Sequence, residues 1–495
     1  MASSRDDHPP YPCHHWPAHR TLRFRNSLRR RGNIHPHRRA ASGGHPWPGA
    51  GWRLPDRRPH HGGNPMTAAL IWIFLPFTAA IGLWALSRHP VQVTRLATLL
   101  CLLLAAAAWL IPIGKVLRLG PLTLEIQPIL LFAGRRLSLT DADRPLLIFF
   151  FTIAAFWFAG ARQAGSHRFF IPYGLAIVSF LVAAIAVEPF LYSALMIEMA
   201  VLLSIPILFP PGQRNVGPGL LRYLIFQTLA MPFILLAGWA LDGVQANPTD
   251  INLIALASLF LSLGFAFWLA IFPFYTWVPL LAGETHPYAI GFLYLLLPIT
   301  SLLLGLEFIN AYGWLRNAPQ LYLLLRWMGA LMVITAGIWS AFQHNAGRLF
   351  GYALIIETGF SLLAVSLNSR LGIEIFTMLF LPRVIGFGLW ALSSSILLQA
   401  GRSMEFQQLE RAAEAWPFAS TGLIVACLSL AGLPLLAHFP IRLVLLEQVA
   451  RQSPLLAVWV LGGNIGFLLS TFRLLAVVTG GYFGPRQPGE RPLQI

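Results

Sequence analysis

Charged side chains are scarce in this sequence. Asp, Glu, Lys and Arg make up 11% of the 495 residues, hydrophobic residues make up 56%, and lysine occurs only once, at Lys115. A typical soluble domain has about 25% charged residues. The scarcity of charge excludes a soluble globular protein and indicates that most of the chain lies in lipid.

Cysteine is also rare. Cys13, Cys101 and Cys427 are scattered along the chain, and two of them lie inside apolar runs. They provide neither a disulfide framework nor the spacing of a metal site. A glycine-rich nucleotide motif, a set of iron–sulfur cysteines and a haem-ligand pair are missing as well. We therefore expect no cofactor on this chain and no redox catalysis by it, which leaves its membership of an enzyme complex open.

The positive charge is concentrated at the N-terminus. Residues 1–65 hold twelve arginines, three aspartates and nine of the fourteen histidines in a Pro- and Gly-rich stretch without periodicity. This composition predicts a basic disordered extension, and no nucleic-acid partner is expected. The alternative is that translation begins at Met66, where a spanning segment starts at the second residue.

The remaining sequence consists of repeated apolar runs, each about 20 residues long, which is the length of a transmembrane helix. We predict an all-α polytopic membrane protein with about thirteen transmembrane helices, in the lipid bilayer of a bacterial inner membrane. The predicted spans are 67–87, 95–113, 145–161, 169–187, 189–210, 219–241, 252–281, 287–310, 319–342, 348–368, 371–399, 417–450 and 455–480.

One loop has the periodicity of a strand. Leu122, Leu124 and Ile126 alternate with polar residues, which predicts a small β-hairpin outside the membrane. Arginines gather in the odd-numbered loops after Met66, so that side is expected to be cytoplasmic. The basic residues of the hairpin loop oppose this orientation unless the loop folds as a unit. The predicted organisation is an extension (1–65), two helices with the hairpin (66–144), helix three with a first repeat (145–310), a second repeat (311–480) and a tail (481–495).

The predicted helices contain charged residues that insertion into the bilayer centre would penalise by about 2.5–3.5 kcal/mol each. Three features recur at nearly one spacing: the acids are 159 residues apart, two arginines 161 apart, and two prolines 161 apart. This spacing predicts two inverted repeats of five helices, each with a helix broken by proline. The acids are Glu198 and Glu357, the arginines Arg222 and Arg383, and the prolines Pro273 and Pro434.

These charges form a candidate proton pathway. A pair such as Glu198 with Arg222 would lower the burial cost and tie the proton affinity of the acid to the position of its partner. Static ion pairs in a packed bundle are the alternative. Arg222 can instead lie at a helix end and snorkel to the interface, and His286 can be an ordinary loop residue. The candidate residues are Glu198, Arg222, Glu357, Arg383, Arg442, His286 and His438.

Four segments carry a family resemblance. The stretch "LGFAFWLAIFPFYTWVPLLAGETHPYAIGFL" resembles the signature of antiporter-like subunits of respiratory complex I and of Mrp-type cation/proton antiporters. "YSALMIEMAVLLS", "FQHNAGRLFGYALIIETGFSLLAVSL" and "AGLPLLAHFPIRLVLL" follow in the order of that family. The resemblance covers about residues 145–480. The matching residues are Gly264, Pro273, Phe274, Trp277, Pro279, Pro287, Glu198, Gln343, Arg348, Tyr352, Gly359, Gly432, Pro434, Phe439 and Arg442.

The departures from the family pattern concern its lysines. The central lysine of the family aligns with Trp268, a second falls near Gly386, and a third is Arg442. Arginine hardly deprotonates in a protein, so Arg442 can hold a charge but cannot serve as a carrier that releases its proton.

The resemblance implies a membrane subunit of a complex I-like NADH:quinone oxidoreductase that contributes to proton translocation. Its expected partners are other antiporter-like membrane subunits and hydrophilic redox subunits. One alternative is a degenerate structural or coupling subunit that no longer pumps, which the missing lysines favour. Another is an unrelated secondary transporter. The sequence leaves open whether H⁺ or Na⁺ moves and which quinone is used.

Overall fold

The computed structural model describes residues 66–119, 122–210, 216–246 and 250–480. The predicted N-terminal extension (1–65) and C-terminal tail (481–495) lie outside these ranges. The first part of the described chain holds a π-helical turn, η1 (Leu70–Phe74), and two short 3₁₀ turns, η2 (Asp141–Asp143) and η3 (Phe190–Tyr192). Its longer helices are α1 (Leu75–Ala85), α2 (Pro90–Leu110), α3 (Arg144–Gly160), α4 (Phe170–Ala186), α5 (Ser193–Leu208), α6 (Pro218–Ala246), α7 (Ile251–Trp268), α8 (Trp277–Glu284) and α9 (Pro287–Ala311).

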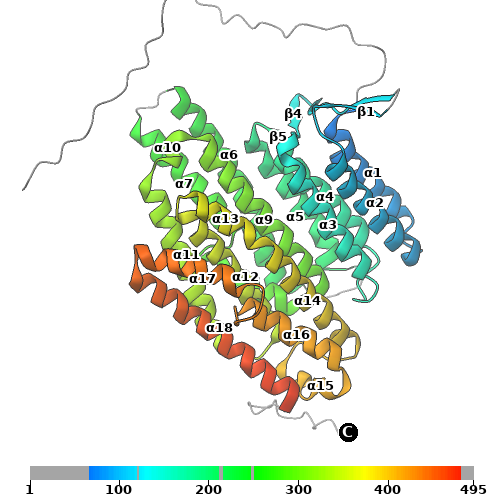
Figure 1. Cartoon of the computed structure of the whole chain (residues 1–495), viewed down its shortest axis with the longest axis vertical. Helices are drawn as coiled ribbons and strands as arrows, with labels where there is room; N and C mark the ends of the chain where they lie inside the picture. The colour runs from blue at the N-terminus through cyan, green and yellow to red at the C-terminus, as the bar shows by residue number, and fades with distance from the viewer. Residues whose placement is uncertain (1–65, 120–121, 211–215, 247–249, 481–495) are drawn as a thin grey trace, which may run out of the picture. The chain divides into compact units, whose positions relative to one another are not determined.

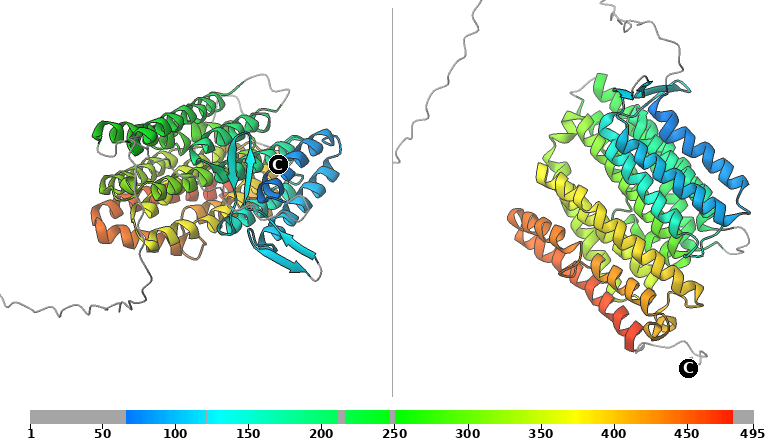
Figure 2. Two further views of the ribbon diagram at one scale, coloured as in Figure 1. Left: turned by 90° about the horizontal axis from the view of Figure 1, so that it is seen from above. Right: turned by 45° about the vertical axis from the view of Figure 1, so that its right-hand side comes forward.

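The first part also holds the 3₁₀ turn η4 (Phe274–Thr276), just before α8. The second part is helical as well, with a 3₁₀ turn at η5 (Phe406–Leu409). Figures 1 and 2 show α1 and α2 on one side of the described bundle and α16 to α18 on the opposite side. The helices of this part are α10 (Gly313–Arg316), α11 (Pro319–Ala341), α12 (Ala346–Ser366), α13 (Arg370–Met378), α14 (Phe380–Gln399), α15 (Ala412–Ala415), α16 (Pro417–Leu430), α17 (Phe439–Gln452) and α18 (Pro454–Gly480).

Within the described residues, nine helices are long and apolar enough to cross a membrane, and four shorter helices are also apolar. Each of the thirteen predicted spans contains at least one observed helix. The chain is therefore a multi-pass membrane protein built mainly from helices. The exact number of crossings and the inverted orientation of the two repeats stay predictions.

Local sequence sets where many of these helices begin. Pro90, Pro287, Pro319 and Pro417 each occupy the first helical position, where the missing proline N–H costs no hydrogen bond. Other helices begin with a side-chain cap: Asp250 accepts from the backbone N–H of Asn252 and Leu253. Such caps satisfy N–H groups that the first turn of a helix leaves unpaired.

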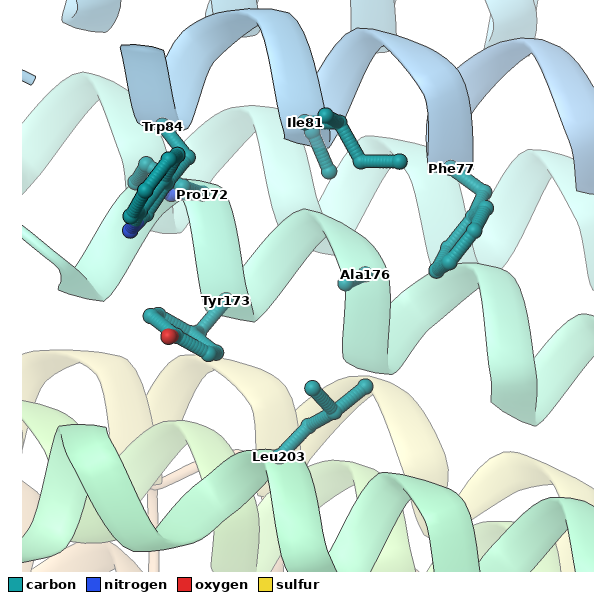
Figure 3. A pocket seen from close by; sticks show the side chains of 8 residues that line it. Phe77, Ile81, Trp84, Pro172, Tyr173, Ala176 and Leu203 are labelled. Carbon is teal, nitrogen blue, oxygen red and sulfur yellow. The ribbon is translucent and has the colours of Figure 1, made fainter.

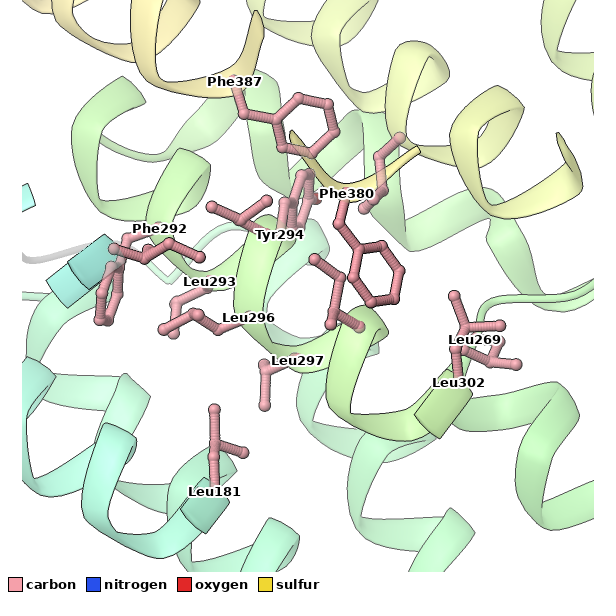
Figure 4. Close-up of a cluster of buried hydrophobic side chains, with 14 of the residues drawn as sticks. Leu181, Leu269, Phe292, Leu293, Tyr294, Leu296, Leu297, Leu302, Phe380 and Phe387 are labelled. Carbon is pink, nitrogen blue, oxygen red and sulfur yellow. The ribbon is translucent and has the colours of Figure 1, made fainter. Parts of the chain in front are cut away.

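The core of the bundle is formed around α9 and α12. Every residue of α12 except Arg348 is buried. Figure 4 shows side chains of α9, among them Phe292, Leu293 and Leu296, packed between neighbouring helices. The peripheral helices instead expose large apolar side chains such as Trp109 and Trp239, as expected of helices that face lipid.

An apolar groove lies between α1, α4 and α5. It is lined by side chains such as Phe77, Trp84 and Leu203, and no charged residue takes part (Figure 3). Because its walls carry almost no polar atoms, this groove offers no route for charge.

Two helices are interrupted. The backbone leaves α7 at Trp268, passes Pro273 and resumes helical structure at η4 and α8. The second interruption lies between Leu430 and Phe439, and Pro434 falls inside it. Such breaks free backbone groups that must face protein or water at membrane depth, so both are places where polar side chains can gather.

The predicted hairpin is part of a larger β region. Strands β1 (Val116–Leu119) and β2 (Leu122–Glu125) form one antiparallel pair, and β3 (Ile129–Phe132) and β4 (Arg135–Ser138) form a second. Strand β5 (Val187–Glu188), which precedes α5, joins β4 and completes a three-stranded sheet. The alternation of apolar and polar residues at Leu122 and Leu124 predicted β2 correctly. It gave no signal for β5, because two residues are too few to show a period.

Asp141 compensates part of the positive charge in this region. Its carboxylate lies 2.7 Å from Lys115 Nζ and 3.0 Å from Arg144 Nη1, and it also accepts from the backbone N–H of Ile113. The Arg135 guanidinium stacks 3.9 Å from the ring centre of Tyr192. These contacts support the expectation that the basic loop folds as a unit.

A buried charge centre at the second helix break

Glu357 lies at the middle of a cluster of charged side chains. It belongs to α12, and its side chain is completely buried. Arg383, Arg442 and His438 approach its carboxylate from α14, from α17 and from the break between α16 and α17. All three partners have at most 3% of their side chains exposed. We refer to these four residues as the charge centre.

Arg383 binds the first oxygen of the carboxylate and the backbone beside it. Its Nη2 lies 3.3 Å from Glu357 Oε2 and donates to the backbone carbonyl of Glu357 at 2.8 Å. The same nitrogen donates to Ser361 Oγ at 2.6 Å. Glu357 and Ser361 are one turn apart on α12, so a single guanidinium fixes α14 against that turn.

Arg442 binds the second oxygen. Its Nη2 donates to Glu357 Oε1, and its Nη1 donates to Asn464 Oδ1 at 2.9 Å. The Asn464 amide in turn donates to the Ala431 carbonyl at 2.9 Å, just past the end of α16. Asn464 of α18 therefore links the Ala431 carbonyl at the helix break to Arg442 of the charge centre.

His438, in the break, lies beside the same oxygen. Its Nε2 lies 3.2 Å from Glu357 Oε1, while its Nδ1 lies 3.1 Å from the hydroxyl of Ser429 in α16. The two ring nitrogens of an imidazole can bind and release a proton separately. His438 therefore lies between a hydroxyl and a carboxylate, one at each ring nitrogen.

The hydrogen bonding of the centre is incomplete. Within the described part of the chain, three buried nitrogens of the centre have no hydrogen-bond partner: Arg383 Nη1, Arg442 Nε and His438 Nε2. Two guanidinium groups share one carboxylate, so positive charge is in excess even when the imidazole is neutral. The two guanidinium groups attract the buried carboxylate strongly. Removal of the carboxylate or of a guanidinium group would leave a buried charge without its compensating partner.

The first half of the chain is arranged differently. Glu198 in α5 accepts from Thr228 Oγ1 at 2.9 Å, and its second oxygen has no partner among the described residues. The predicted pair of Glu198 with Arg222 is wrong: it is not among the ion pairs of the described residues, and Arg222 is exposed near the start of α6. Arg222 and Thr228 are six positions apart on one helix, which places them about 9 Å apart along the axis and on different faces.

Trp268 lies at the position that the motif resemblance aligns with a lysine of the family. It ends α7, is 3% exposed, and its carbonyl accepts from Gln227 Nε2 at 3.2 Å. The side-chain amide of Gln227 thus donates to a backbone carbonyl at the first break, as the Asn464 amide does at the second. Neither partner of that bond can change its charge.

His286 lies apart from both groups. Its Nδ1 accepts from the backbone N–H of Tyr288 at 3.3 Å and caps the start of α9. Its observed contact is that of a helix cap. Within the described residues, no group of three His, Cys, Asp or Glu side chains gathers as metal ligands would.

Sequence reasoning missed the polar residues that support the charge centre, namely Ser361, Ser429 and Asn464. Each lies in an otherwise apolar run, "ETGFSLL", "ACLSLAG" and "LGGNIGF". Asn464 could have been noticed, because an asparagine inside a membrane helix needs a partner. Serine gives little signal, since it can bond to its own helix.

Comparison with known proteins places this geometry in a family. Residues 241–468 match the model of the NADH:quinone oxidoreductase/Mrp antiporter transmembrane family. This segment contains both helix breaks and all four residues of the charge centre. This part of the chain is similar to the antiporter-like family.

Individual relatives are distant. The chain is 22% identical over 298 residues to NAD(P)H-quinone oxidoreductase chain 4-2 of Synechocystis sp., an alignment that covers 54% of this chain and 50% of the relative. It is 24% identical over 290 residues to NADH-quinone oxidoreductase subunit N of Acidithiobacillus ferrooxidans, with 54% and 58% covered. The chain thus spans little more than half the length of these curated relatives.

Solved structures share the fold of this chain over most of its length. A chain of the Mrp complex from Dietzia sp. superposes with a TM-score of 0.69 at 15% identity, covering 85% of this chain and 81% of that chain. A chain of respiratory complex I from Thermus thermophilus gives a TM-score of 0.63 at 20% identity, covering 85% and 92%. The resemblance drawn from the sequence motifs is therefore confirmed.

Proposed function

We propose that this chain is a membrane subunit of a complex I-like, proton-translocating complex in a bacterial cell membrane. The charge centre at the second helix break carries the proposal: a buried carboxylate contacts two arginines and a histidine from three other segments. The proposed partners are antiporter-like membrane subunits and hydrophilic redox subunits. We assign electron transfer to those redox subunits, and we propose that this chain binds no cofactor.

The groups that can exchange a proton in the centre are Glu357 and His438. The two arginines stay protonated, so they set the local field and do not carry the proton. A proton reaching His438 from the Ser429 side can leave from the other ring nitrogen toward Glu357. A shift of Arg383 or Arg442 relative to the carboxylate would change how strongly Glu357 holds that proton. Redox work elsewhere in the complex would supply such a shift.

The second candidate function is a structural or coupling subunit that does not pump. It is supported by Trp268, which replaces a titratable lysine, and by Glu198, which has no cationic partner among the ion pairs of the described residues. Both features belong to the first half. We therefore assign the charge movement to the second half and expect the first half to be passive.

Isolation from the native membrane tests membership of a complex. The chain, carrying an affinity tag and extracted in mild detergent, is expected to co-purify with other membrane subunits and with proteins that carry redox cofactors. Mass spectrometry of the eluate identifies them, and an unrelated tagged membrane protein is the control. Recovery of the chain alone would contradict both functions and favour a secondary transporter.

Exchange of Glu198 for glutamine tests the passive first half. Glu198→Gln removes a partly unpaired carboxylate but keeps an acceptor for Thr228, so we expect the free energy of unfolding to fall by no more than about 1 kcal/mol. Proton translocation by the intact complex, reconstituted in liposomes, should stay close to that of the native protein. Loss of translocation with normal assembly would place Glu198 in the proton path.

A further inference from the structure

A cavity with two arginines in its lining lies between the two halves of the chain, and none of its lining residues belongs to the charge centre. Its volume is about 370 Å³, within the range of small-molecule sites, and it lies between the starts of α6 and α12, the end of α11 and the first break. The charged and polar side chains that line it are Arg222, Arg348, Tyr275, Thr276, Gln343 and Tyr352.

The cavity has two cations and no matching anion of its own. Neither Arg222 nor Arg348 takes part in an ion pair within the described ranges. The nearby carboxylate of Glu284 accepts from the backbone N–H of Gly219 at 2.9 Å and is used as a cap for α6. The stem of Arg348 packs on Gly283, where an added Cβ would come within 2.9 Å of its Cγ. Arg348 is thus held at the wall of the cavity.

The surroundings are those of a membrane interface. Trp339, which lines the cavity, is 54% exposed, and Phe342, three residues further on, is 69% exposed. Tryptophan side chains such as Trp339 are enriched at the level of the lipid headgroups. Arg348 also belongs to the arginine-rich set of loops, the side that the sequence predicts to be cytoplasmic, where anionic lipids attract basic pockets.

We propose that this cavity binds the phosphate of an anionic glycerophospholipid. The guanidinium groups of Arg222 and Arg348 would pair with the phosphate oxygens, because guanidinium forms charge-assisted hydrogen bonds to phosphate. The hydroxyl groups of Tyr275, Thr276 and Tyr352 are further donors at the cavity wall. The acyl chains would extend past Trp339 into the bilayer. Such a lipid would link α6 and α8 of the first half to α11 and α12 of the second.

Lipid titration of the purified full chain tests this proposal. Native mass spectrometry in detergent would follow binding of phosphatidylglycerol and of phosphatidylcholine with the same acyl chains. The native chain should prefer phosphatidylglycerol, and Arg222→Gln and Arg348→Gln should each weaken that binding by about tenfold. Arg316→Gln is the matched control, because Arg316 is also exposed but ends α10 and lies outside the cavity lining.

Three outcomes would overturn the proposal. Equal binding of the two lipids by the native chain would remove the role of the anionic headgroup. Unchanged phosphatidylglycerol binding by Arg222→Gln would exclude this cavity as the site; Arg222 is exposed, so that variant should fold even if Arg348→Gln does not. Inorganic phosphate that displaces phosphatidylglycerol at equal concentration would assign the cavity to a free anion and not to a lipid.

Discussion

Replacement of Glu357 by glutamine is expected to abolish proton translocation by the complex and to destabilise this chain by about 3–5 kcal/mol. The reason is the same for both effects: the carboxylate is the only anion that the centre presents to Arg383 and Arg442, and all three groups are buried. Glutamine has the same shape but leaves two facing guanidinium groups without compensation. Acidification of liposomes containing the complex measures translocation, and chemical unfolding of the purified chain in detergent measures stability.

Two further variants make this result specific. Glu374→Gln, on the adjacent helix α13, breaks an exposed pair with Arg370 and should change stability by only about 0–1 kcal/mol. The double variant Glu357→Gln, Arg383→Met removes one of the two uncompensated cations. It should be more stable than Glu357→Gln alone, and translocation should stay absent. A Glu357→Gln complex that still translocates protons at the native rate would show that the centre is a static support.

Replacement of Gly463 by valine is expected to destabilise the chain by at least about 1–3 kcal/mol, because it forces α18 away from α11. An added Cβ at Gly463 would lie 2.6 Å from the Val333 carbonyl and 2.7 Å from the Cα of Ile334, both of them backbone atoms that cannot move aside. The next residue, Asn464, holds Arg442. The substitution should therefore also lower translocation, by releasing Arg442 from its support.

Gly462 provides a matched control for this experiment. It precedes Gly463 directly, and a Cβ at this position would meet nothing within 4 Å. Gly462→Val should stay within about 0.5 kcal/mol of the native stability, and its translocation should be normal. Equal stability of the two variants would show that the close approach of α11 and α18 does not limit packing.

Much of the helical framework could be predicted from the sequence. Apolar runs long enough to cross a bilayer located a helix in every predicted span, and Pro273 and Pro434 fell inside the two observed interruptions. These features are local: the length of an apolar run and the missing N–H of proline act on the chain within a few residues. The scarcity of charge likewise makes each acid and each arginine within an apolar run conspicuous in the sequence.

The pairing of those charges could not be predicted in the same way. Glu357 pairs with Arg383, 26 residues away, and with Arg442, 85 residues away. Glu198 and Arg222 have nearly the spacing of the first of these pairs, yet they do not meet. Whether two groups on different helices meet depends on the rotation and the offset of each helix, and a shift of two residues turns a side chain by about 200°. An equal spacing in the sequence therefore does not imply an equal contact.

From the sequence alone follow a multi-pass membrane protein, a resemblance to the antiporter-like family, two broken helices and few buried charges, because hydrophobic length and proline act locally. Which of the charges meet depends on the tertiary packing. It gathered Glu357, Arg383, Arg442 and His438 at the second break, satisfied the first break with an amide beside Trp268, and placed Arg222 at a separate cavity. Helix packing brings such distant residues together, and no local pattern encodes it.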